Sequence, residues 1–574
     1  MPIYSTGTRW NTGHRFTLCV IVFLGLQAAA QPERAIAQTP GFIVDGRGGM
    51  SAGGELENYV RYLQALGLAP LSAWSIRPFA PATSDTLVGT PAAHPWRGRG
   101  PFQDDPTVKR LTLLPISVVS RENTGYPFGS NDGPVWAGRG LTMSVQTGVA
   151  GKFGPVSIVL DPIVFTAANT SFRLQPNGET GRLRFADGDF PTNVDRPQRF
   201  GDKRYSAFDP GESTIRIDTH GVTAGITSAN EWWGPATTFP VILSNNAAGI
   251  PRFFVGTERP TSIGIGTFQI RLEYGIERQS AFSPVTGSKT FTGPDSSGTL
   301  RFMSGLITTF SPRGIPGLEI GAARFFHQAW LGSVGRSELL SPFEGLVKNS
   351  LPAGVNVAGI GTQDALKNQL ASVFFRWVLP HSGVEVYGEY GHEDHNADFR
   401  DLESELDHSR IAMAGLRKAF VRSDKKFFAI RGEFFDGYAP TLERHRAEGL
   451  IYVHNPIRQG HTEEGQLLGA DIGVGSIGGQ IIAWDTYSGS GRTTVFVDRK
   501  SENNFANFYA TGIESPAATD ISATTGIERL AFTKWGSVFA AISTTYRGGD
   551  HRYAAARGLN VNLQLGATVT HFGI

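Results

Sequence analysis

Apolar and polar residues alternate one by one along many segments of this chain. The segment 267–276, TFQIRLEYGI, places Phe, Ile, Leu and Tyr on one face and Thr, Gln, Arg, Glu and Gly on the other. Residues 559–570, LNVNLQLGATVT, repeat the pattern, and so do residues 425–435 and 382–391. Strict alternation over about ten residues is typical of a membrane-spanning β-strand, whose apolar face meets lipid while its polar face meets the lumen.

The length and number of these segments separate two kinds of β-protein. Strands of a soluble sandwich also alternate, but they usually hold about five or six residues, whereas many segments here are longer. Their polar face is rich in Arg, Glu and Gln, which suits a wide, wet lumen. From about Val108 onward we count roughly sixteen to eighteen such segments, in the range of large outer-membrane barrels. The predicted fold is therefore all-β, a large antiparallel transmembrane barrel, with a secreted β-protein as the alternative.

A helical pattern precedes the barrel. In residues 55–66 the apolar residues recur at the spacing of one helix face, and Gly67 can end the helix. A stretch rich in Pro, Gly and Ala follows, to about Asp105. We predict a small helical unit over residues 38–105 on the periplasmic side, where it would plug or cap the barrel mouth, and the barrel over residues 106–574. The apolar stripe consists of Leu56, Val60, Leu63 and Leu66.

The first residues have the pattern of an export signal. Arg9, His14 and Arg15 precede the apolar run FTLCVIVFLGLQAAA, and small residues follow it. This arrangement predicts a secretory signal peptide over residues 1–37 that is cleaved at its end, with an earlier cut or an uncleaved anchor as alternatives. Because the single cysteine, Cys19, lies in this run, the mature chain would have neither disulfides nor thiolate chemistry.

The amino-acid composition limits the kinds of partner and the cellular location that this protein can have. Charged residues make up 18% of the chain, below the roughly 25% typical of soluble globular proteins. The formal net charge is +1, so there is no electrostatic case for nucleic acid as a partner. No later run of apolar residues is long enough for a spanning helix. The predicted location is therefore the bacterial outer membrane, with membrane lipid around the barrel.

Two groups of residues invite a chemical interpretation. The segment that begins at residue 391 with GHEDH carries potential metal ligands, but its histidines do not have the H-E-x-x-H spacing of a zinc helix, so we predict no metal. Glu385 and Glu389 flank Tyr387 on one strand face, roughly 13 Å apart at about 3.3 Å per residue. That separation is too large for the carboxylate pair of a glycosidase, so we predict no enzyme and no cofactor, although another strand could still supply a partner to Glu389.

The stretch 231–251, EWWGPATTFPVILSNNAAGIP, combines adjacent tryptophans, a Gly-Pro break, a short apolar run and paired asparagines. Its pattern predicts that the tryptophans close one wall strand, that Gly-Pro turns the chain, and that VILS starts the next wall strand with the asparagines at its end. Aromatic rings mixed with amides and charged groups suit sugars. The alternative is that polar groups inside the barrel only satisfy one another.

Several ordered motifs of the chain resemble the capsule-assembly Wzi family of outer-membrane proteins. The resemblance covers essentially the whole mature chain. It implies a large barrel with a small helical bundle at its periplasmic face, and a lectin-like role in which capsular polysaccharide is held at the cell surface without catalysis. The motifs are LENYVRYLQALGLAPLSAWSIRP from residue 56, DPGESTIRI from residue 209, the stretch 231–251, NQLASVFFRWVLPHSGVEVYGEYGHEDH from residue 368, DHSRIAMAGLRK from residue 407 and YVHNPIRQGHTEEGQLLGADIGVGS from residue 452.

The resemblance also implies candidate residues. The implied roles are stacking on sugar rings for the tryptophans and hydrogen bonds to hydroxyl groups for the others, with a fold-specifying network inside the barrel as the alternative. The implied partners are capsular polysaccharide or exopolysaccharide and the polysaccharide export machinery. A substrate-specific porin and an outer-membrane hydrolase are the alternative functions. The candidate residues are Trp232, Trp233, Asn245, Asn246, Arg259, Glu389, His392, Asp394 and His395.

Overall fold

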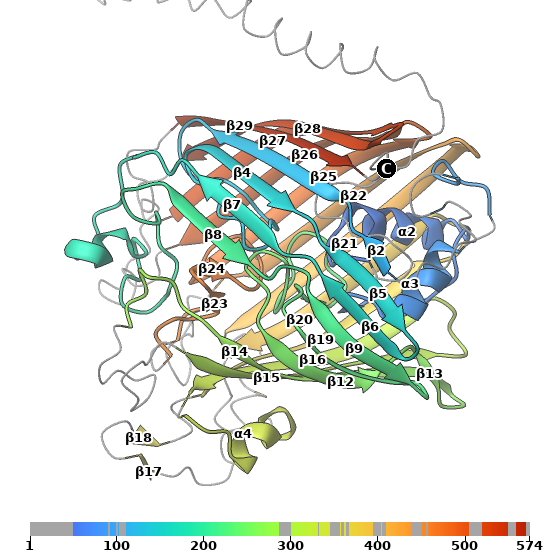
Figure 1. Cartoon of the computed structure of the whole chain (residues 1–574), viewed down its shortest axis with the longest axis horizontal. Coiled ribbons are helices and arrows are strands. Elements are labelled where there is room, and N and C mark those ends of the chain that lie inside the picture. Colours follow the sequence, from blue (N-terminus) through green and yellow to red (C-terminus); the bar gives the residue numbers. More distant parts are fainter. Residues whose placement is uncertain are drawn as a thin grey trace, which may run out of the picture.

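The computed structural model places most of the chain in one large antiparallel sheet that curls into a barrel (Figure 1). The predicted signal peptide, residues 1–37, lies outside the described residues. The structure describes residues 50–89, 92–98, 102, 111–285, 300–330, 332–344, 356–357, 361–362, 367–393, 403, 409–438, 450–454, 457–503, 519–548 and 558–569.

The barrel wall is a ring of hydrogen-bonded strands. Each strand pairs antiparallel with its neighbours, and β29 pairs with β3, which closes the ring. The strands are β2 (Leu111–Leu113), β3 (Ile116–Asn123), β4 (Gly140–Gln146), β5 (Val149–Phe153), β6 (Val156–Leu160), β7 (Ile163–Ala167), β8 (Tyr205–Asp209), β9 (Thr214–Thr219), β10 (Val222–Thr227), β12 (Arg252–Thr257), β13 (Thr261–Ser262), β14 (Gly266–Glu277), β15 (Arg301–Pro312), β16 (Leu318–Ala329), β19 (Lys367–Leu379), β20 (Val384–Glu393), β21 (Arg410–Ser423), β22 (Lys426–Gly437), β25 (Ser476–Ser488), β26 (Gly491–Asn503), β27 (Thr519–Thr533), β28 (Gly536–Gly548) and β29 (Gly558–Val569).

Several of these strands are halves of longer ones. The pairs β2–β3, β4–β5, β6–β7 and β8–β9 each continue across a short break, because β2 pairs with β5, β4 with β7, β6 with β9 and β7 with β8. Strands β12 and β13 likewise share the partner β14. The 23 strands of the sheet less these five therefore give 18 positions around the described wall. The prediction of a large antiparallel barrel with about 16–18 strands is confirmed.

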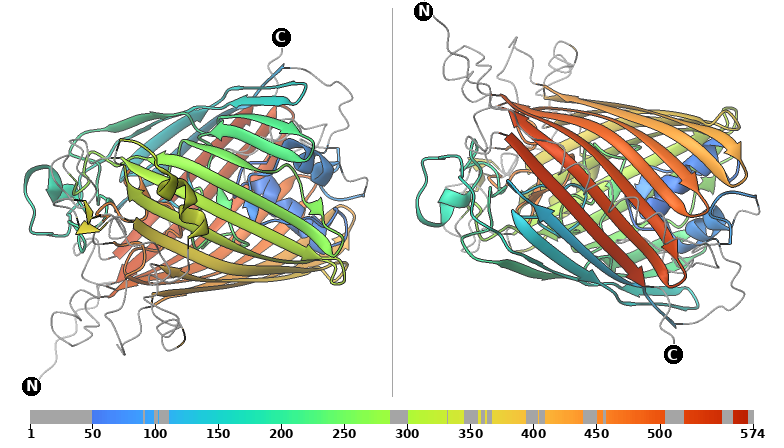
Figure 2. Two further views of the ribbon diagram at one scale, coloured as in Figure 1. Left: turned by 90° about the horizontal axis from the view of Figure 1, so that it is seen from below. Right: turned by 90° about the horizontal axis from the view of Figure 1, so that it is seen from above.

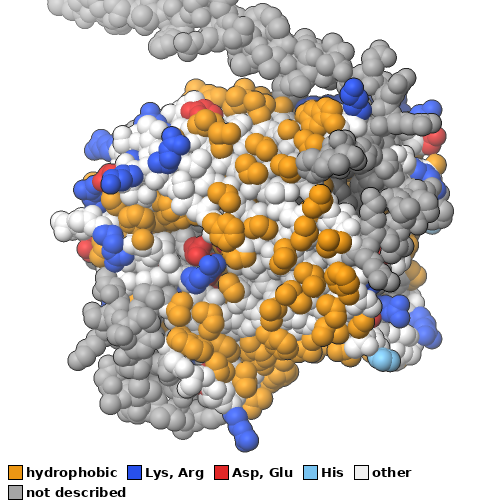
Figure 3. Space-filling view, viewed as in Figure 1, with side chains coloured by type: hydrophobic (Ala, Val, Ile, Leu, Met, Phe, Trp, Pro, Cys, Tyr) orange, Lys and Arg blue, Asp and Glu red, His pale blue; other side chains and the backbone are white. Residues whose placement is uncertain are grey.

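The alternation predicted from the sequence decides which side chains face inward. In β29 the apolar residues Leu559, Leu563 and Leu565 are exposed, whereas Asn560 and Asn562 are buried in the lumen. In β14 the polar Arg271 and Glu273 are buried. Figure 3 shows the apolar side chains gathered over the outside of the wall, with most charged groups toward the two ends. This outer surface has the apolar band of a barrel that faces lipid.

Neighbouring strands are joined at two ends of different character. At one end the connections are short: two residues join β21 to β22, β25 to β26 and β27 to β28. At the other end they are long, as between β7 and β8 or between β22 and β25. We call these the short-turn end and the long-loop end. Bacterial barrels place short turns in the periplasm and long loops outside the cell.

A small helical unit fills the lumen at the short-turn end. It contains α2 (Glu55–Ala65) and α3 (Pro81–Val88), which lie within the ring of strands (Figures 1 and 2). Tyr59 of α2 stacks on Trp96 with 3.9 Å between ring centroids, and its ring centroid lies 5.2 Å from that of Tyr487 in the wall. The backbone N–H of Gly383, in the β19–β20 turn, donates to the carbonyl of Ala65 over 3.0 Å. The predicted helix is confirmed, and Leu56, Val60 and Leu63 of its apolar stripe are buried, whereas Leu66 follows the last helical residue and is half-buried.

The stretch 231–251 does not form part of the wall, and here the prediction was wrong. Only β11 (Trp232–Trp233) is a strand, and it pairs inside the lumen with β1 (Ile76–Arg77) of the helical unit. The run VILS is not a wall strand, because Val241, Ile242 and Leu243 are all buried in one core cluster. Three consecutive buried residues do not fit a wall with one face on lipid. The segment between β10 and β12 is therefore an internal plug, and the lumen is not the wide, wet space that the polar faces suggested.

Short elements in the long connections complete the structure. The two-stranded ribbon of β23 and β24 lies in the connection from β22 to β25, residues 438–475. Among the described helices, none has the length and apolar content of a membrane-spanning segment. The remaining elements are η2 (Gly181–Phe185), α4 (Arg336–Leu340), η3 (Ser341–Phe343), β17 (Asn356–Val357), β18 (Gly361–Thr362), β23 (Thr462–Glu463) and β24 (Gln466–Leu467).

The aromatic contacts of α2 predict that docking of the helical unit depends on Tyr59. We expect Tyr59→Ala to weaken docking by about 3–5 kcal/mol, the usual cost of removing a large buried aromatic side chain. Hydrogen exchange of the backbone amides of residues 55–65 would then speed up, while the barrel itself stays folded. The control is Tyr546→Ala, because Tyr546 is 57% exposed on the outside of the wall. Unchanged protection of α2 in Tyr59→Ala would contradict the prediction.

Candidate functional site

The two adjacent tryptophans are the centre of the internal plug. Trp232 is 1% exposed and Trp233 is 0% exposed. The guanidinium of Arg77 lies 5.1 Å from the ring centroid of Trp232, and the indole N–H of Trp233 donates to Glu231 Oε2 over 3.1 Å. A Cβ added at Gly305 would come within 2.5 Å of the Trp233 ring. Neither indole thus has an open face on which a sugar could stack in this structure.

Glu231 connects the plug to the wall by charge. Its carboxylate lies 2.6 Å from Arg271 of β14 and 3.4 Å from Arg252 of β12. Burial alone would raise the pKa of the Glu231 carboxyl, but Arg252 and Arg271 bring that pKa below its usual value. The carboxylate is therefore held in its charged form. The negative charge of Glu231 thus lies beside the two positively charged arginines whose side chains point inward from β12 and β14.

The paired asparagines join three separate segments inside the barrel. Asn245 donates from its side-chain Nδ2 to the backbone carbonyl of Ala52 over 3.1 Å. The backbone carbonyl of Asn245 accepts from the N–H of Gly133 over 2.6 Å. Asn246 donates from Nδ2 to the carbonyl of Leu467 over 3.1 Å. These contacts tie the plug to the start of the helical unit, to the β3–β4 loop and to the β23–β24 ribbon.

Glu389 faces the lumen, as the alternation predicts. Its Oε1 accepts from the Ser372 hydroxyl over 2.7 Å. Its Oε2 lies so close to Gly234 that a Cβ there would be 2.3 Å away, and Gly234 also has a φ of +84°. Glu385, on the same strand face, accepts from Arg376 over 3.0 Å and also from Arg61. Glu385 therefore holds the helical unit against the wall, and Glu389 packs against the plug.

The other candidate residues are not gathered around Glu389. His392 is three residues beyond Glu389 on β20, so its side chain is on the opposite, outer face, where its ring centroid lies 5.3 Å from that of Tyr390. Arg259 is exposed in the connection from β12 to β13, at the short-turn end. Asp394 and His395 lie outside the described residues. The structure thus brings together Trp232, Trp233, Asn245, Asn246 and Glu389, and separates Arg259 and His392 from them.

Two glutamates that the sequence did not single out anchor the internal segments. Glu433 of β22 accepts from the backbone N–H groups of Thr237 (2.5 Å), Thr238 (2.8 Å) and Phe239 (3.0 Å). Glu319 of β16 accepts from the backbone N–H groups of Trp74 (2.7 Å) and Ser75 (3.0 Å) in the helical unit. Alternation places both carboxylates in the lumen, but the sequence carries no signal for the loops whose backbone they bind.

A chain of two histidines fixes the β22–β25 connection in the same way. His461 Nε2 lies 2.6 Å from the carbonyl of Ile242, which can only accept, so this nitrogen donates. Burial, with His327 beside it, holds the pKa of the His461 imidazole well below its usual value, so the ring is neutral. Its Nδ1 then accepts from His327 Nε2 over 2.7 Å, and His327 Nδ1 lies 2.8 Å from Glu277. This chain links the connection and the plug to β16 and β14.

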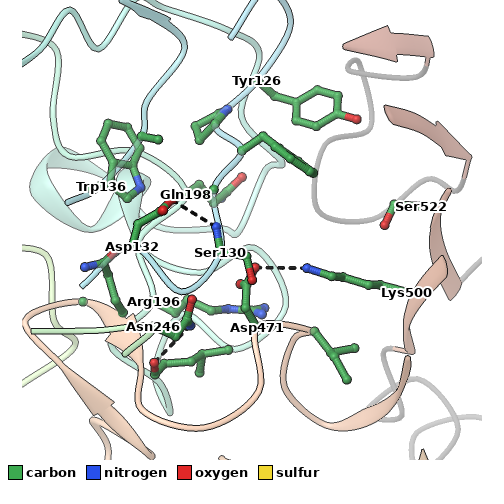
Figure 4. Close-up of a pocket in the computed structure, with 18 of the residues that line it drawn as sticks. Tyr126, Ser130, Asp132, Trp136, Arg196, Gln198, Asn246, Asp471, Lys500 and Ser522 are labelled. Atoms are coloured by element: carbon green, nitrogen blue, oxygen red, sulfur yellow. Dashed lines mark hydrogen bonds and ion pairs between the residues drawn. The ribbon is translucent and has the colours of Figure 1, made fainter. Parts of the chain in front are cut away.

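A polar cavity of about 150 Å³ opens among the loops at the long-loop end (Figure 4). The side chains of Lys500 and Asp471 face one another in it over 3.1 Å. Among the predicted residues that the structure describes, Asn246 alone lines this cavity. Its other labelled lining residues are Tyr126, Ser130, Asp132, Trp136, Arg196, Gln198 and Ser522.

The lining of this loop cavity combines two kinds of group. Trp136 is half-buried, whereas Tyr126 is 2% exposed and the guanidinium of Arg547 lies 5.2 Å from its ring centroid. Amide, hydroxyl and charged side chains also line the cavity. Flat rings that meet C–H faces, together with groups that bind hydroxyls, suit a carbohydrate ligand. No set of three His, Cys, Asp or Glu side chains in the described residues is arranged to hold a metal ion.

Comparisons with known proteins bear on this arrangement. A family model described as capsule assembly protein Wzi matches residues 125–536. Wzi of Escherichia coli, described as a carbohydrate-binding outer-membrane β-barrel involved in group 1 capsule assembly, has a similar structure, with a TM-score of 0.57, 13% identity, and coverage of 90% of this chain and 99% of that chain. The Pseudomonas aeruginosa protein OprD has a TM-score of 0.36 at 8% identity, covering 81% of this chain and 96% of its own. A comparison with curated proteins found no match.

The contacts of Glu433 predict that this one side chain keeps the plug seated. Glu433→Ala would leave three N–H groups in the lumen, one of them buried and two partly buried, without an acceptor, at up to about 1–3 kcal/mol for each. We expect the variant to fold as a barrel but to show frequent openings in planar-bilayer recordings, whereas the wild-type barrel stays closed. Glu338→Ala on α4, outside the wall, is the matched control. A closed Glu433→Ala barrel would show that other contacts suffice to hold the plug.

Proposed function

The chain belongs to the Wzi capsule-assembly family, and on that premise we propose that it binds capsular or extracellular polysaccharide and holds it at the surface of the bacterial outer membrane. The observation that carries the proposal is the combination of a lumen obstructed by the plug and the helical unit with an aromatic and polar cavity among the long loops. An obstructed lumen suits holding better than transport. The cavity opens toward the side on which barrels of this kind meet the exterior.

The alternative functions fit the described residues less well. A substrate-specific porin needs an open path, but the plug and the helical unit occupy the lumen and are fixed to the wall by buried ion pairs. A hydrolase of the glycosidase type needs two carboxylates at a controlled separation. Glu389 instead packs against Gly234 of the plug, and Glu385 binds two arginines. We therefore propose binding without bond formation or cleavage.

The two ends of the barrel suggest an orientation and the remaining partners. We propose that residues 1–37 direct export, that the helical unit predicted over residues 38–105 lies in the periplasm, and that residues 106–574 form the barrel. Outer-membrane lipid would surround the apolar outer face. The polysaccharide export machinery is a further proposed partner, since a polymer that is held at the surface must first be delivered there.

The predicted residues divide into two proposed groups. The contacts that the tryptophans, the Nδ2 groups of the asparagines and Glu389 make with the surrounding protein support a role in seating the plug. His392 lies at the long-loop end of β20, and Asp394 and His395 lie outside the described residues; for these three residues we propose contact with glycan. Arg259 is at the opposite end, on the periplasmic side of our orientation.

A deletion strain tests the proposed function directly. We expect cells without this protein to make polysaccharide in normal total amount but to release it into the medium, because the binding surface is lost while synthesis is untouched. Sugar analysis of the washed cells and of the culture fluid measures the two fractions, with the complemented strain as the control. Equal cell-bound polysaccharide in all strains would contradict the proposal.

The loop cavity makes a separate prediction about Trp136. We expect Trp136→Ala to weaken binding of the producing strain's purified polysaccharide by about tenfold, on the order of 1.4 kcal/mol, the range of a lost aromatic contact. Trp377→Ala is the control, because Trp377 is 39% exposed on the outer face of β19. Binding is measured by surface-plasmon resonance on detergent-solubilised barrel whose folding is verified by circular dichroism. Equal losses in both variants would exclude the loop cavity as the cause.

A further inference from the structure

Two larger cavities continue inward from the loop cavity. Their volumes are about 340 and 350 Å³, in the range of about 300–1,000 Å³ that is usual for small-ligand sites. Ser130 and Asp132 of the β3–β4 loop line all three cavities, and Gly53, Gly54 and Glu55 line the two inner ones. The three spaces therefore border the β3–β4 loop, and the inner two also border the start of the helical unit. We call these two spaces the lumen cavities.

The wall beside the lumen cavities differs from the rest of the barrel. Here β28, β29, β3 and β4 point hydroxyl and amide groups inward, and several of these already form hydrogen bonds with one another, such as Asn562 Nδ2 to Ser543 Oγ at 3.1 Å. Groups of this kind both donate and accept, as sugar hydroxyls do. The neutral polar residues of these strands that line the lumen cavities are Ser117, Asn123, Ser144, Gln146, Ser543, Asn562 and Gln564.

The charges around the lumen cavities leave no excess of positive charge. The first cavity is lined by equal numbers of basic and acidic side chains, and acidic side chains outnumber basic ones in the second. The basic groups have carboxylate partners: Arg492 lies 2.7 Å from Glu55 and 2.9 Å from Glu528, and Arg121 pairs with Asp132. An anionic sugar would have to break such pairs or face unpaired carboxylates. An uncharged one would not.

Two amide oxygens at the second cavity have no partner. Asn131 and Asn245 both line it, and the Oδ1 atom of each lacks a hydrogen bond within the described residues. The amide of Asn245 is oriented by its Nδ2 group, which donates to Ala52. An unpaired buried acceptor is costly, and the hydroxyl of a ligand is the kind of donor that these two oxygens lack.

From these observations we infer that the end of a polysaccharide chain enters the barrel from the long-loop end and that its terminal, uncharged sugar units occupy the lumen cavities. The inference rests on the proposed function and specifies both the position of the site and the chemical class of the units it takes. Because the helical unit closes the inner side of the cavities, a polymer can enter by its end but cannot thread through. The loop cavity would then contact the units that follow.

Neighbouring valines on β3 provide a matched test. Val119 lines the second lumen cavity, whereas Val118 is 37% exposed on the outer face of the wall. Val119→Trp would narrow the cavity without removing a hydrogen-bonding group, and Val118→Trp adds the same bulk on the lipid side. We expect the first variant to bind the producing strain's polysaccharide at least tenfold more weakly than wild type, and the second to bind within twofold of it.

The class of sugar is tested with fragments. The probes are oligosaccharides of two to six units prepared from the same polysaccharide and separated into neutral and anionic fractions. We expect neutral fragments to compete with the polymer for wild-type protein and not for Val119→Trp. Competition by anionic fragments alone would overturn the inferred class.

The outcomes separate this inference from the function on which it rests. Undiminished polymer binding by folded Val119→Trp would overturn insertion of the chain end and leave the proposed function standing. Failure of the wild-type protein to bind the polymer would overturn both. Equal weakening in Val118→Trp and Val119→Trp would show that bulk on β3, and not the lumen cavity, decides binding, and would also overturn the inference.

Discussion

The constraint on which this structure depends is that every charge pointed into the barrel must find a partner there. A closed ring of alternating strands sends half of its side chains inward, and here many of these are arginines and glutamates that are fully buried. A buried charge that loses its partner costs about 3–5 kcal/mol. The wall alone does not satisfy these groups. Arg376 and Glu385 pair across β19 and β20, and Arg61 of the helical unit completes the cluster.

The internal segments follow from this requirement. The plug brings Glu231 to two wall arginines and presents backbone N–H groups to Glu433. The β22–β25 connection brings His461 to His327 and Glu277. The plug, the helical unit and the wall are consequently one electrostatic unit, and removing a segment would leave several wall charges unpaired. This explains why protein segments occupy much of the lumen although its lining is polar.

Alternation in the sequence is sufficient to predict the strands of the wall and the face of each side chain, and helical spacing is sufficient for α2. The partners of the inward groups could not be predicted in this way, because they lie on segments without a repeating pattern. The stretch 231–251 has two tryptophans that would face opposite sides of a wall strand, yet both are buried, because β11 pairs inside the lumen. For His392 the alternation gave the right answer and the motif did not. His392 is three residues from Glu389, which places the two side chains on opposite faces of β20, whereas the motif that contains both suggested a common site.

The distribution of polar groups around the lumen has a consequence for how a polymer can be held. The inward charges of strands β14 to β22 are bound by the plug, by the helical unit and by one another. Their side of the lumen is therefore rigid and closed. Strands β28 to β4 present neutral hydroxyl and amide groups, whose partners can be exchanged at little net cost because each hydrogen bond lost can be replaced by one to a sugar. The rigid half resists displacement when a bound chain is pulled from outside, and the neutral half provides the contacts. Anchoring requires both properties in one barrel, whereas transport would require the rigid half to move.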